Sequence, residues 1–163
     1  MRFDELPLCD AVLNGLQAMN FIEATPVQAE TIPVILQKRD VIACAQTGTG
    51  KTAAFAIPII HNLHRMVGSS NKHKQIRTLV VTPTRELAAQ VAQSVETYGK
   101  YLPFKSAVIF GGVGINPQIS LLKKGVDIVI ATPGRLLDLV SQNCLDLTKI
   151  EFFILDEADR MLD

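Results

Sequence analysis

The sequence has no excess of charge of either sign, because its 16 Lys and Arg residues equal its 16 Asp and Glu residues. Any binding of nucleic acid must therefore depend on a local cluster of donors rather than on the overall field. The chain also has no internal repeat and no apolar run as long as a membrane span. With 163 residues, 48% of them hydrophobic, it is expected to form one globular domain with a sizeable core.

Cysteine is scarce, and Cys9, Cys44 and Cys144 follow neither a disulfide nor a metal-ligand pattern. Reduced thiols of this kind are typical of a cytoplasmic protein. The opening stretch "MRFDELPLCD" carries charges where a signal peptide needs an apolar core. We therefore expect a cytoplasmic protein without a membrane partner.

Five short apolar runs are rich in β-branched or aromatic residues, and none alternates cleanly with polar residues. They are residues 40–44, 78–82, 107–110, 127–131 and 152–155. This pattern predicts strands that are covered on both faces of a parallel sheet, with Cys44 buried in the first. Helical patterns lie between the runs, and one of them has the apolar stripe Leu87, Val91, Val95 and Tyr98, which we assign to the core. The predicted fold class is α/β, an open and mainly parallel sheet flanked by helices, with ligands beyond the carboxyl ends of the strands.

A glycine-rich loop, "AQTGTGKT" at Ala45–Thr52, follows the first run and precedes a helical pattern. It matches the phosphate-binding loop pattern except that Ala45 replaces the first glycine. Gly48 and Gly50 allow backbone N–H groups to point at phosphate oxygens. Lys51 is suited to the β- and γ-phosphates and the Thr52 hydroxyl to Mg²⁺, so the loop predicts binding of a nucleotide.

The last apolar run ends in "DEAD", Asp156–Asp159. Asp156 at the carboxyl end of a strand is suited to hold Mg²⁺ through water, and Glu157 is suited to orient and deprotonate an attacking water. The alternative is a cluster of acids that caps a helix start.

These motifs, together with "PTRELA" at 83–88, "GG" at 111–112 and "TPGR" at 132–135, resemble the first RecA-like domain of DEAD-box ATP-dependent RNA helicases in order and approximate spacing. The resemblance covers residues 1–163 and is of bacterial type. It implies an N-terminal RecA-like P-loop domain that uses ATP and Mg²⁺, within an enzyme that couples ATP hydrolysis to local unwinding of RNA.

The resemblance implies that residues 1–29 include an adenine-reading segment, in which Gln28 hydrogen-bonds the base and Phe21 stacks on it. The residues alone favour the other interpretation, in which Phe21 is a core aromatic and Gln28 an ordinary helix residue. The implied nucleotide contacts are Phe3, Phe21, Thr25, Gln28, Gln46, Thr47, Gly48, Thr49, Gly50, Lys51 and Thr52. The implied catalytic residues are Lys51, Asp156 and Glu157, the implied metal ligands are Thr52 and Asp156, and Asp159 is implied to couple the motifs.

The resemblance also implies an RNA path with sequence-independent contacts to the sugar–phosphate backbone. The implied RNA-binding residues are Pro83, Thr84, Arg85, Gly111, Gly112, Thr132, Pro133, Gly134 and Arg135. Arginines pair with phosphates and glycines allow close approach of the backbone, which makes the assignment physically reasonable. The residues alone favour the other interpretation, in which these motifs are helix-starting turns with surface arginines.

Two parts that the resemblance implies are absent from the sequence, namely a Ser-Ala-Thr strand and a second RecA-like domain with arginine fingers. We therefore expect this chain to be a truncated piece that binds nucleotide, hydrolyses ATP very slowly and unwinds nothing. Without the missing strand, we expect marginal stability or pairing with another copy. A nucleotide-gated RNA-binding module without turnover is the alternative. A GTPase or nucleotide kinase is less favoured, because "NKHK" lacks the Asp of a guanine-reading motif.

Overall fold

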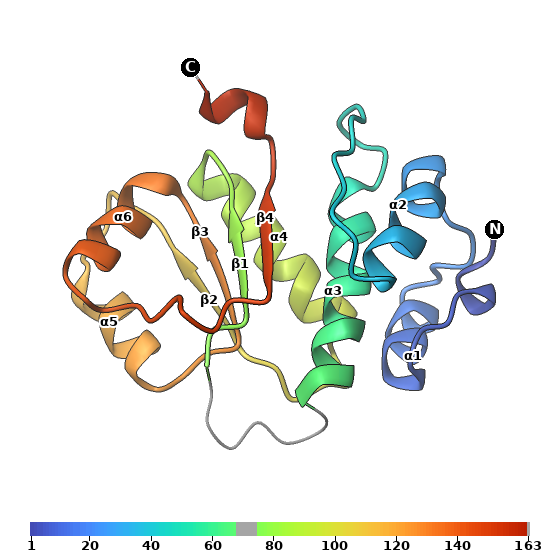
Figure 1. The fold of residues 1–163 in the computed structure, drawn as a ribbon, viewed down its shortest axis with the longest axis horizontal. Helices are drawn as coiled ribbons and strands as arrows, with labels where there is room; N and C mark the ends of the chain where they lie inside the picture. Colours follow the sequence, from blue (N-terminus) through green and yellow to red (C-terminus); the bar gives the residue numbers. More distant parts are fainter. Residues whose placement is uncertain (68–74, 163) are drawn as a thin grey trace. The chain divides into compact units, whose positions relative to one another are not determined.

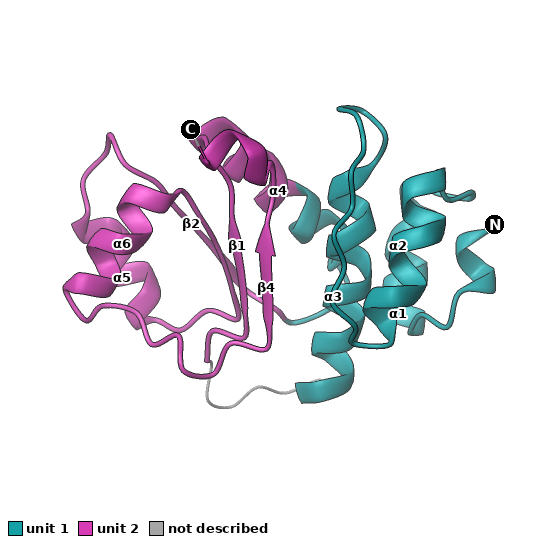
Figure 2. Cartoon of the chain, turned by 45° about the horizontal axis from the view of Figure 1, so that its top comes forward, with its two compact units in different colours: residues 1–70, 94–103 teal, residues 71–93, 104–163 magenta. Residues whose placement is uncertain are grey.

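The structure, a computed structural model, describes residues 1–67 and 75–162. The chain divides into two compact units, one of residues 1–70 and 94–103 and the other of residues 71–93 and 104–163 (Figure 2). Helix α4 (Arg85–Tyr98) contributes residues to both units. In the part of the chain that the structure describes, no helix is long and apolar enough to cross a membrane.

The first unit is built from helices (Figure 1). Its elements are the 3₁₀ turn η1 (Phe3–Glu5) and the helices α1 (Asp10–Ala18), α2 (Pro26–Leu36) and α3 (Lys51–Val67). Helices α2 and α3 pack along each other, and α1 also contacts α3. Buried Asn62 on α3 donates from Nδ2 to the Ile35 carbonyl (2.8 Å), which satisfies a backbone acceptor in the last turn of α2. This packing holds α3 along α2.

The strand predicted for residues 40–44 is not formed, and this prediction was wrong. Ile42 is 95% exposed, and Cys44 is exposed rather than buried. A strand requires ladder partners for its backbone N–H and C=O groups, and the described residues supply no such ladder to this run. Local apolar composition is therefore insufficient to make it a strand.

The second unit contains a four-stranded, all-parallel sheet in the order β2-β3-β1-β4 (Figure 1). The strands are β1 (Thr78–Val81), β2 (Ser106–Ile109), β3 (Ile128–Ala131) and β4 (Phe152–Leu155). Helices α5 (Asn116–Lys123) and α6 (Pro133–Ser141) connect them, and the 3₁₀ turn η2 (Ala158–Met161) follows β4. The α/β class and four of the five predicted strands are confirmed.

The central strands and the edge strand β4 differ in burial. All four residues of β1 and of β3 are buried, as a strand covered on both faces requires. Strand β4 pairs with β1 at the end of the sheet, and its Phe153 and Leu155 are 58% and 53% exposed. Marginal stability, or pairing with a second copy, was expected from the missing strand, and it stays a prediction.

Candidate functional site

Three aromatic rings of the first unit contact one another at the segment between α1 and α2. The Phe3 and Phe21 ring centroids are 6.1 Å apart at an interplanar angle of 22°, and those of Phe21 and Tyr98 are 5.8 Å apart at 50°. The Phe3 side chain is 2% exposed, so Phe21 packs against a buried ring. Burial raises the pKa of the Tyr98 phenol. The sequence analysis placed Tyr98 only in the core, and nothing local in the sequence predicts its contact with Phe21.

The N-terminal residues hold this segment through the backbone. The Phe3 N–H donates to the Ile22 carbonyl (3.0 Å), and the Ala24 N–H donates to the Met1 carbonyl (2.9 Å). Phe21 is therefore fixed both by ring contacts and by the backbone bonds of the residues that follow it.

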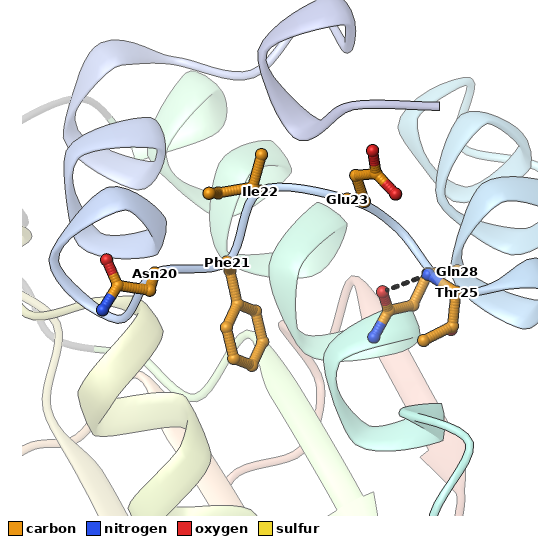
Figure 3. Close-up of a pocket in the computed structure, with 6 residues that line it drawn as sticks. All are labelled: Asn20, Phe21, Ile22, Glu23, Thr25 and Gln28. Atoms are coloured by element: carbon orange, nitrogen blue, oxygen red, sulfur yellow. Dashed lines mark hydrogen bonds between the residues drawn. The ribbon is translucent and has the colours of Figure 1, made fainter.

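A cavity of about 420 Å³ opens beside this segment. Its volume lies in the usual range for a small-molecule site. The lining residues are Asn20, Phe21, Ile22, Glu23, Thr25 and Gln28 (Figure 3). The cavity combines an aromatic ring with an amide and a carboxylate, which is suitable chemistry for a planar heteroaromatic base.

Gln28 and Thr25 join this cavity to the phosphate-binding loop. The Gln28 Oε1 accepts from the Thr25 N–H (2.9 Å), as drawn in Figure 3, and its Nε2 donates to the Gly50 carbonyl (3.1 Å). The Thr25 hydroxyl donates to the Thr49 carbonyl (2.8 Å). An amide can donate two hydrogen bonds and accept two, so Gln28 keeps capacity for a ligand. Neither interpretation of Gln28 from the sequence, as a contact to the base or as an ordinary helix residue, predicts its contact with Gly50.

The phosphate-binding loop has the backbone that its glycines predict. Gly48 and Gly50 have φ values of +84° and +85°, a region that other residues rarely adopt. A Cβ at Gly50 would collide with Gln28 Nε2, whereas none of the neighbouring atoms lies within 4 Å of one at Gly48. The Thr49 hydroxyl donates to the Gln46 carbonyl (2.6 Å), and Thr47 is exposed.

Lys51 and Thr52 form the first turn of α3, directly after the loop, and both side chains are half-buried. The start of a 17-residue helix carries unsatisfied N–H groups and a positive partial charge. A curled loop, a cation and a hydroxyl therefore lie together in one unit. These residues fit a phosphate chain with an associated metal ion.

The carboxylates of the second unit follow β4. The Asp156 N–H donates to the Val81 carbonyl (2.9 Å), which continues the ladder with β1, and Asp156 and Glu157 are half-buried. Glu157 has a φ of +55°, a left-handed conformation that costs about 1 kcal/mol or more in a residue with a side chain. Asp159 lies in η2 and is exposed. No group of three or more His, Cys, Asp or Glu side chains in the described residues could hold a metal ion by itself. A magnesium ion would therefore need oxygen ligands from a phosphate and water.

The three implied RNA-binding loops follow adjacent strands of one sheet. Pro83–Arg85 follow β1, Gly111–Gly112 follow β2 and Thr132–Arg135 follow β3. Because β2 pairs with β3 and β3 with β1, all in parallel, the three loops lie along one sheet edge. The sequence predicted this grouping correctly.

Local contacts shape each of these loops. The Thr84 hydroxyl accepts from the Leu87 N–H (3.2 Å) at the start of α4, and Thr132 precedes α6 with Pro133 in its first turn. The Arg85 guanidinium carbon lies 5.1 Å from the centre of the Phe110 ring. Gly112 has a φ of +80°. Thr84 and Thr132 thus lie at helix starts. The interpretation of these motifs as helix-starting turns also predicted this position.

Comparisons with known proteins agree with these motifs. The family model described as "DEAD/DEAH box helicase" matches residues 25–163. The DEAD-box ATP-dependent RNA helicase CshA of Bacillus cereus is 46% identical over 162 residues, which are 99% of this chain and 30% of that protein. The ATP-dependent RNA helicase RhlB of Shewanella amazonensis is 42% identical, with 99% of this chain and 37% of that protein covered. The chain therefore spans roughly a third of these relatives.

Solved structures share the fold. A DEAD box protein from Methanococcus jannaschii superposes with a TM-score of 0.89 at 43% identity, covering 99% of this chain and 43% of that chain. A hypothetical ATP-dependent RNA helicase from Sulfolobus tokodaii gives 0.83 at 42% identity, covering 94% of this chain and 42% of that chain. These likenesses confirm the RecA-like fold class. The chain belongs to the DEAD/DEAH box helicase family.

Proposed function

We propose that residues 1–163 are the N-terminal RecA-like domain of a cytoplasmic ATP-dependent RNA helicase, and that the chain binds ATP with Mg²⁺ and the backbone of RNA. The observation that carries this proposal is the pair of contacts from Gln28 and Thr25 to the carbonyls of Gly50 and Thr49. They connect a base-sized cavity to a phosphate-binding loop within one unit. Phe21 stacks on the base and Gln28 hydrogen-bonds its edge.

The proposed roles of the remaining residues follow their chemistry. Lys51 neutralises the β- and γ-phosphates, and N–H groups of residues 46–50 cradle them. When bound, Mg²⁺ offsets phosphate charge, and Thr52 and Asp156 are the residues that hold it, the latter through water. Glu157 orients and deprotonates a water, and Asp159 couples the motifs.

Competition between nucleotides tests the proposal. A fluorescent ATP analogue bound to this chain is expected to be displaced by ATP at least tenfold better than by GTP, and EDTA is expected to weaken its binding. Gln28→Leu is expected to lose the preference for ATP, whereas Gln17→Leu, at an exposed position on α1, is the matched control. Equal displacement by GTP, or insensitivity to EDTA, contradicts the proposal.

The intact helicase requires a second RecA-like domain, and this chain covers only about a third of the relatives it matches. An arginine finger from elsewhere contributes about 10³ to 10⁵ in turnover. The chain alone is therefore expected to act as a nucleotide-gated RNA-binding module with very slow hydrolysis. RNA-stimulated hydrolysis at the rate of a two-domain helicase would contradict this expectation.

A further inference from the structure

A buried amide lies behind the loops of the second unit that are proposed to face RNA. Gln118, in the first turn of α5, is 7% exposed. Its Nε2 donates to the Phe110 carbonyl (2.9 Å), and its Oε1 accepts from Arg135 Nη1 (3.0 Å). Since a carbonyl only accepts and a guanidinium only donates, these two partners fix the orientation of the amide.

Arg135 closes the same network from the other side. Its Nη2 donates to the Val113 carbonyl (2.9 Å). Phe110 and Val113 flank the Gly111–Gly112 pair, so the backbone on both sides of the glycines is held. The Phe110 ring is also the surface on which Arg85 lies. The Gln118 amide thus connects Arg135 to the Gly111–Gly112 loop, and Phe110 carries the contact with Arg85.

We propose that Gln118 is a positioning residue for RNA binding, which fixes the Arg135 guanidinium and the Gly111–Gly112 loop without touching RNA. This inference rests on the proposed binding of RNA by this chain. A guanidinium has five N–H donors, and the two used here leave three for a phosphate. An arginine that is held before binding loses less side-chain entropy when the phosphate arrives.

The competing explanation is that Gln118 only stabilises the fold. A buried amide that satisfies a carbonyl contributes to stability in any case, because its loss leaves that carbonyl without its partner. The two explanations differ in how Arg135 behaves. If Gln118 only stabilises, Arg135 neutralises its phosphate equally well when the amide is absent.

The test measures binding of fluorescent single-stranded oligouridylate to the full chain by anisotropy over a series of salt concentrations. Gln118→Leu is expected to weaken binding about tenfold. It is also expected to lower the slope of log Kd against log salt concentration by about one, because one phosphate contact is lost. Adding Gln118→Leu to Arg135→Gln is expected to weaken binding by less than Gln118→Leu does alone, since only its effect through the Gly111–Gly112 loop remains. Gln142→Leu, at an exposed position, is the matched control and is expected to bind as the unaltered chain does.

An unchanged affinity and slope in Gln118→Leu overturns the role of Gln118, as does an additive double variant. No binding by the unaltered chain overturns RNA binding itself, and this inference with it. If Gln118→Leu does not fold, Gln118→Met, which keeps the volume, replaces it.

NMR of the unaltered chain gives a measurement that needs no variant. The terminal nitrogens of Arg135 are expected to rotate slowly about the Nε–Cζ bond, and fast rotation overturns the proposal.

Discussion

The segment of the first unit that is proposed to bind the base and the loops of the second unit that are proposed to face RNA are fixed in different ways. These three loops follow paired parallel strands, so the sheet register places them along one edge. The segment at 20–25 has no sheet beneath it, and it depends on Phe3, on the Met1 and Ile22 backbone bonds and on Gln28. The apolar runs of the sequence therefore predict how the three loops are placed, whereas the segment at 20–25 depends on contacts between residues distant in the chain.

This comparison predicts different responses to mutation. Changes in the first unit should affect stability and nucleotide binding together, because the same contacts support both. Changes in the three loops at the carboxyl ends of β1, β2 and β3 should affect RNA binding with little effect on stability. The strands position these loops independently of any single surface side chain.

The largest effect is expected for Phe3→Ala. Removing a ring that is 2% exposed should lower the free energy of unfolding by about 3 kcal/mol, and Phe21 then loses its support. Chemical denaturation gives the first quantity, and titration with a fluorescent ATP analogue is expected to show at least tenfold weaker binding. Tyr101→Ala, at a position that is 52% exposed, should change stability by less than about 0.5 kcal/mol. Equal effects of the two substitutions would contradict the supporting role of Phe3.

Gly50→Ala comes next, with Gly48→Ala as its matched control. Both glycines have positive φ, so both substitutions introduce backbone strain of about 1 kcal/mol. Only Gly50→Ala also places a Cβ against Gln28. Its free energy of unfolding should therefore fall by about 2 kcal/mol, with the larger loss of nucleotide affinity. Denaturation curves and nucleotide titrations that coincide for the two variants would show that the contact with Gln28 is unimportant.

The edge strand β4 gives a prediction about association. Phe153 and Leu155 are exposed on a strand that, within residues 1–67 and 75–162, pairs with β1 alone, an arrangement that favours pairing with another chain. The chain is expected to self-associate as its concentration rises. Phe153→Lys should weaken this association about tenfold, because a charge on an edge strand opposes pairing. Sedimentation velocity at several concentrations measures the effect, and a monomer at every concentration contradicts the prediction.

A smaller effect on stability is expected for Arg85→Gln. Its guanidinium lies over the Phe110 ring at an exposed position, so stability should fall by only about 0.5 kcal/mol. RNA affinity should fall about tenfold and equally for all RNA sequences, since a phosphate contact reads no base. Lys124→Gln removes the same charge from the end of α5 and is the control. Loss of RNA binding that varies with base sequence would contradict a backbone contact.

The strands show how far the sequence could lead. Residues 79–81 and 128–131 are apolar throughout and buried, as strands covered on both faces of a parallel sheet require. Residues 41–44 are also apolar, yet they form no strand, because ladder partners are not encoded in the run itself. The conformation of the phosphate-binding loop could be predicted because positive φ is a local property of glycine.

The residues that escaped prediction act through non-local contacts. Tyr98 contacts Phe21, and Gln118 contacts Arg135, across separations that carry no sequence pattern. Each looks like an ordinary helix residue when it is read with its neighbours alone. The sequence therefore predicts which loops carry the chemistry, while the contacts that orient their side chains require the three-dimensional structure.

The smallest predicted effect concerns pH and the first unit. His61 Nδ1 accepts from the Cys9 N–H (2.9 Å) before α1, so this nitrogen must be unprotonated. Burial lowers the pKa of His61 below its ordinary value of 6.5, with smaller contributions from Arg65 and His64.

The sign of the pH dependence follows from the lowered pKa. Below pH 6.5 the unfolded chain binds the proton more readily than the folded chain, so stability is full above that pH and falls as the pH drops toward the folded pKa. His61→Asn keeps an acceptor near Cys9 but does not titrate, and its stability should vary less between pH 7 and pH 5. Thermal unfolding across this range measures the difference. Added salt should leave most of the difference in place, because burial rather than charge repulsion is the larger cause. Parallel pH profiles for the two proteins would show that the N-terminal residues, on which the segment at 20–25 depends, are held without His61.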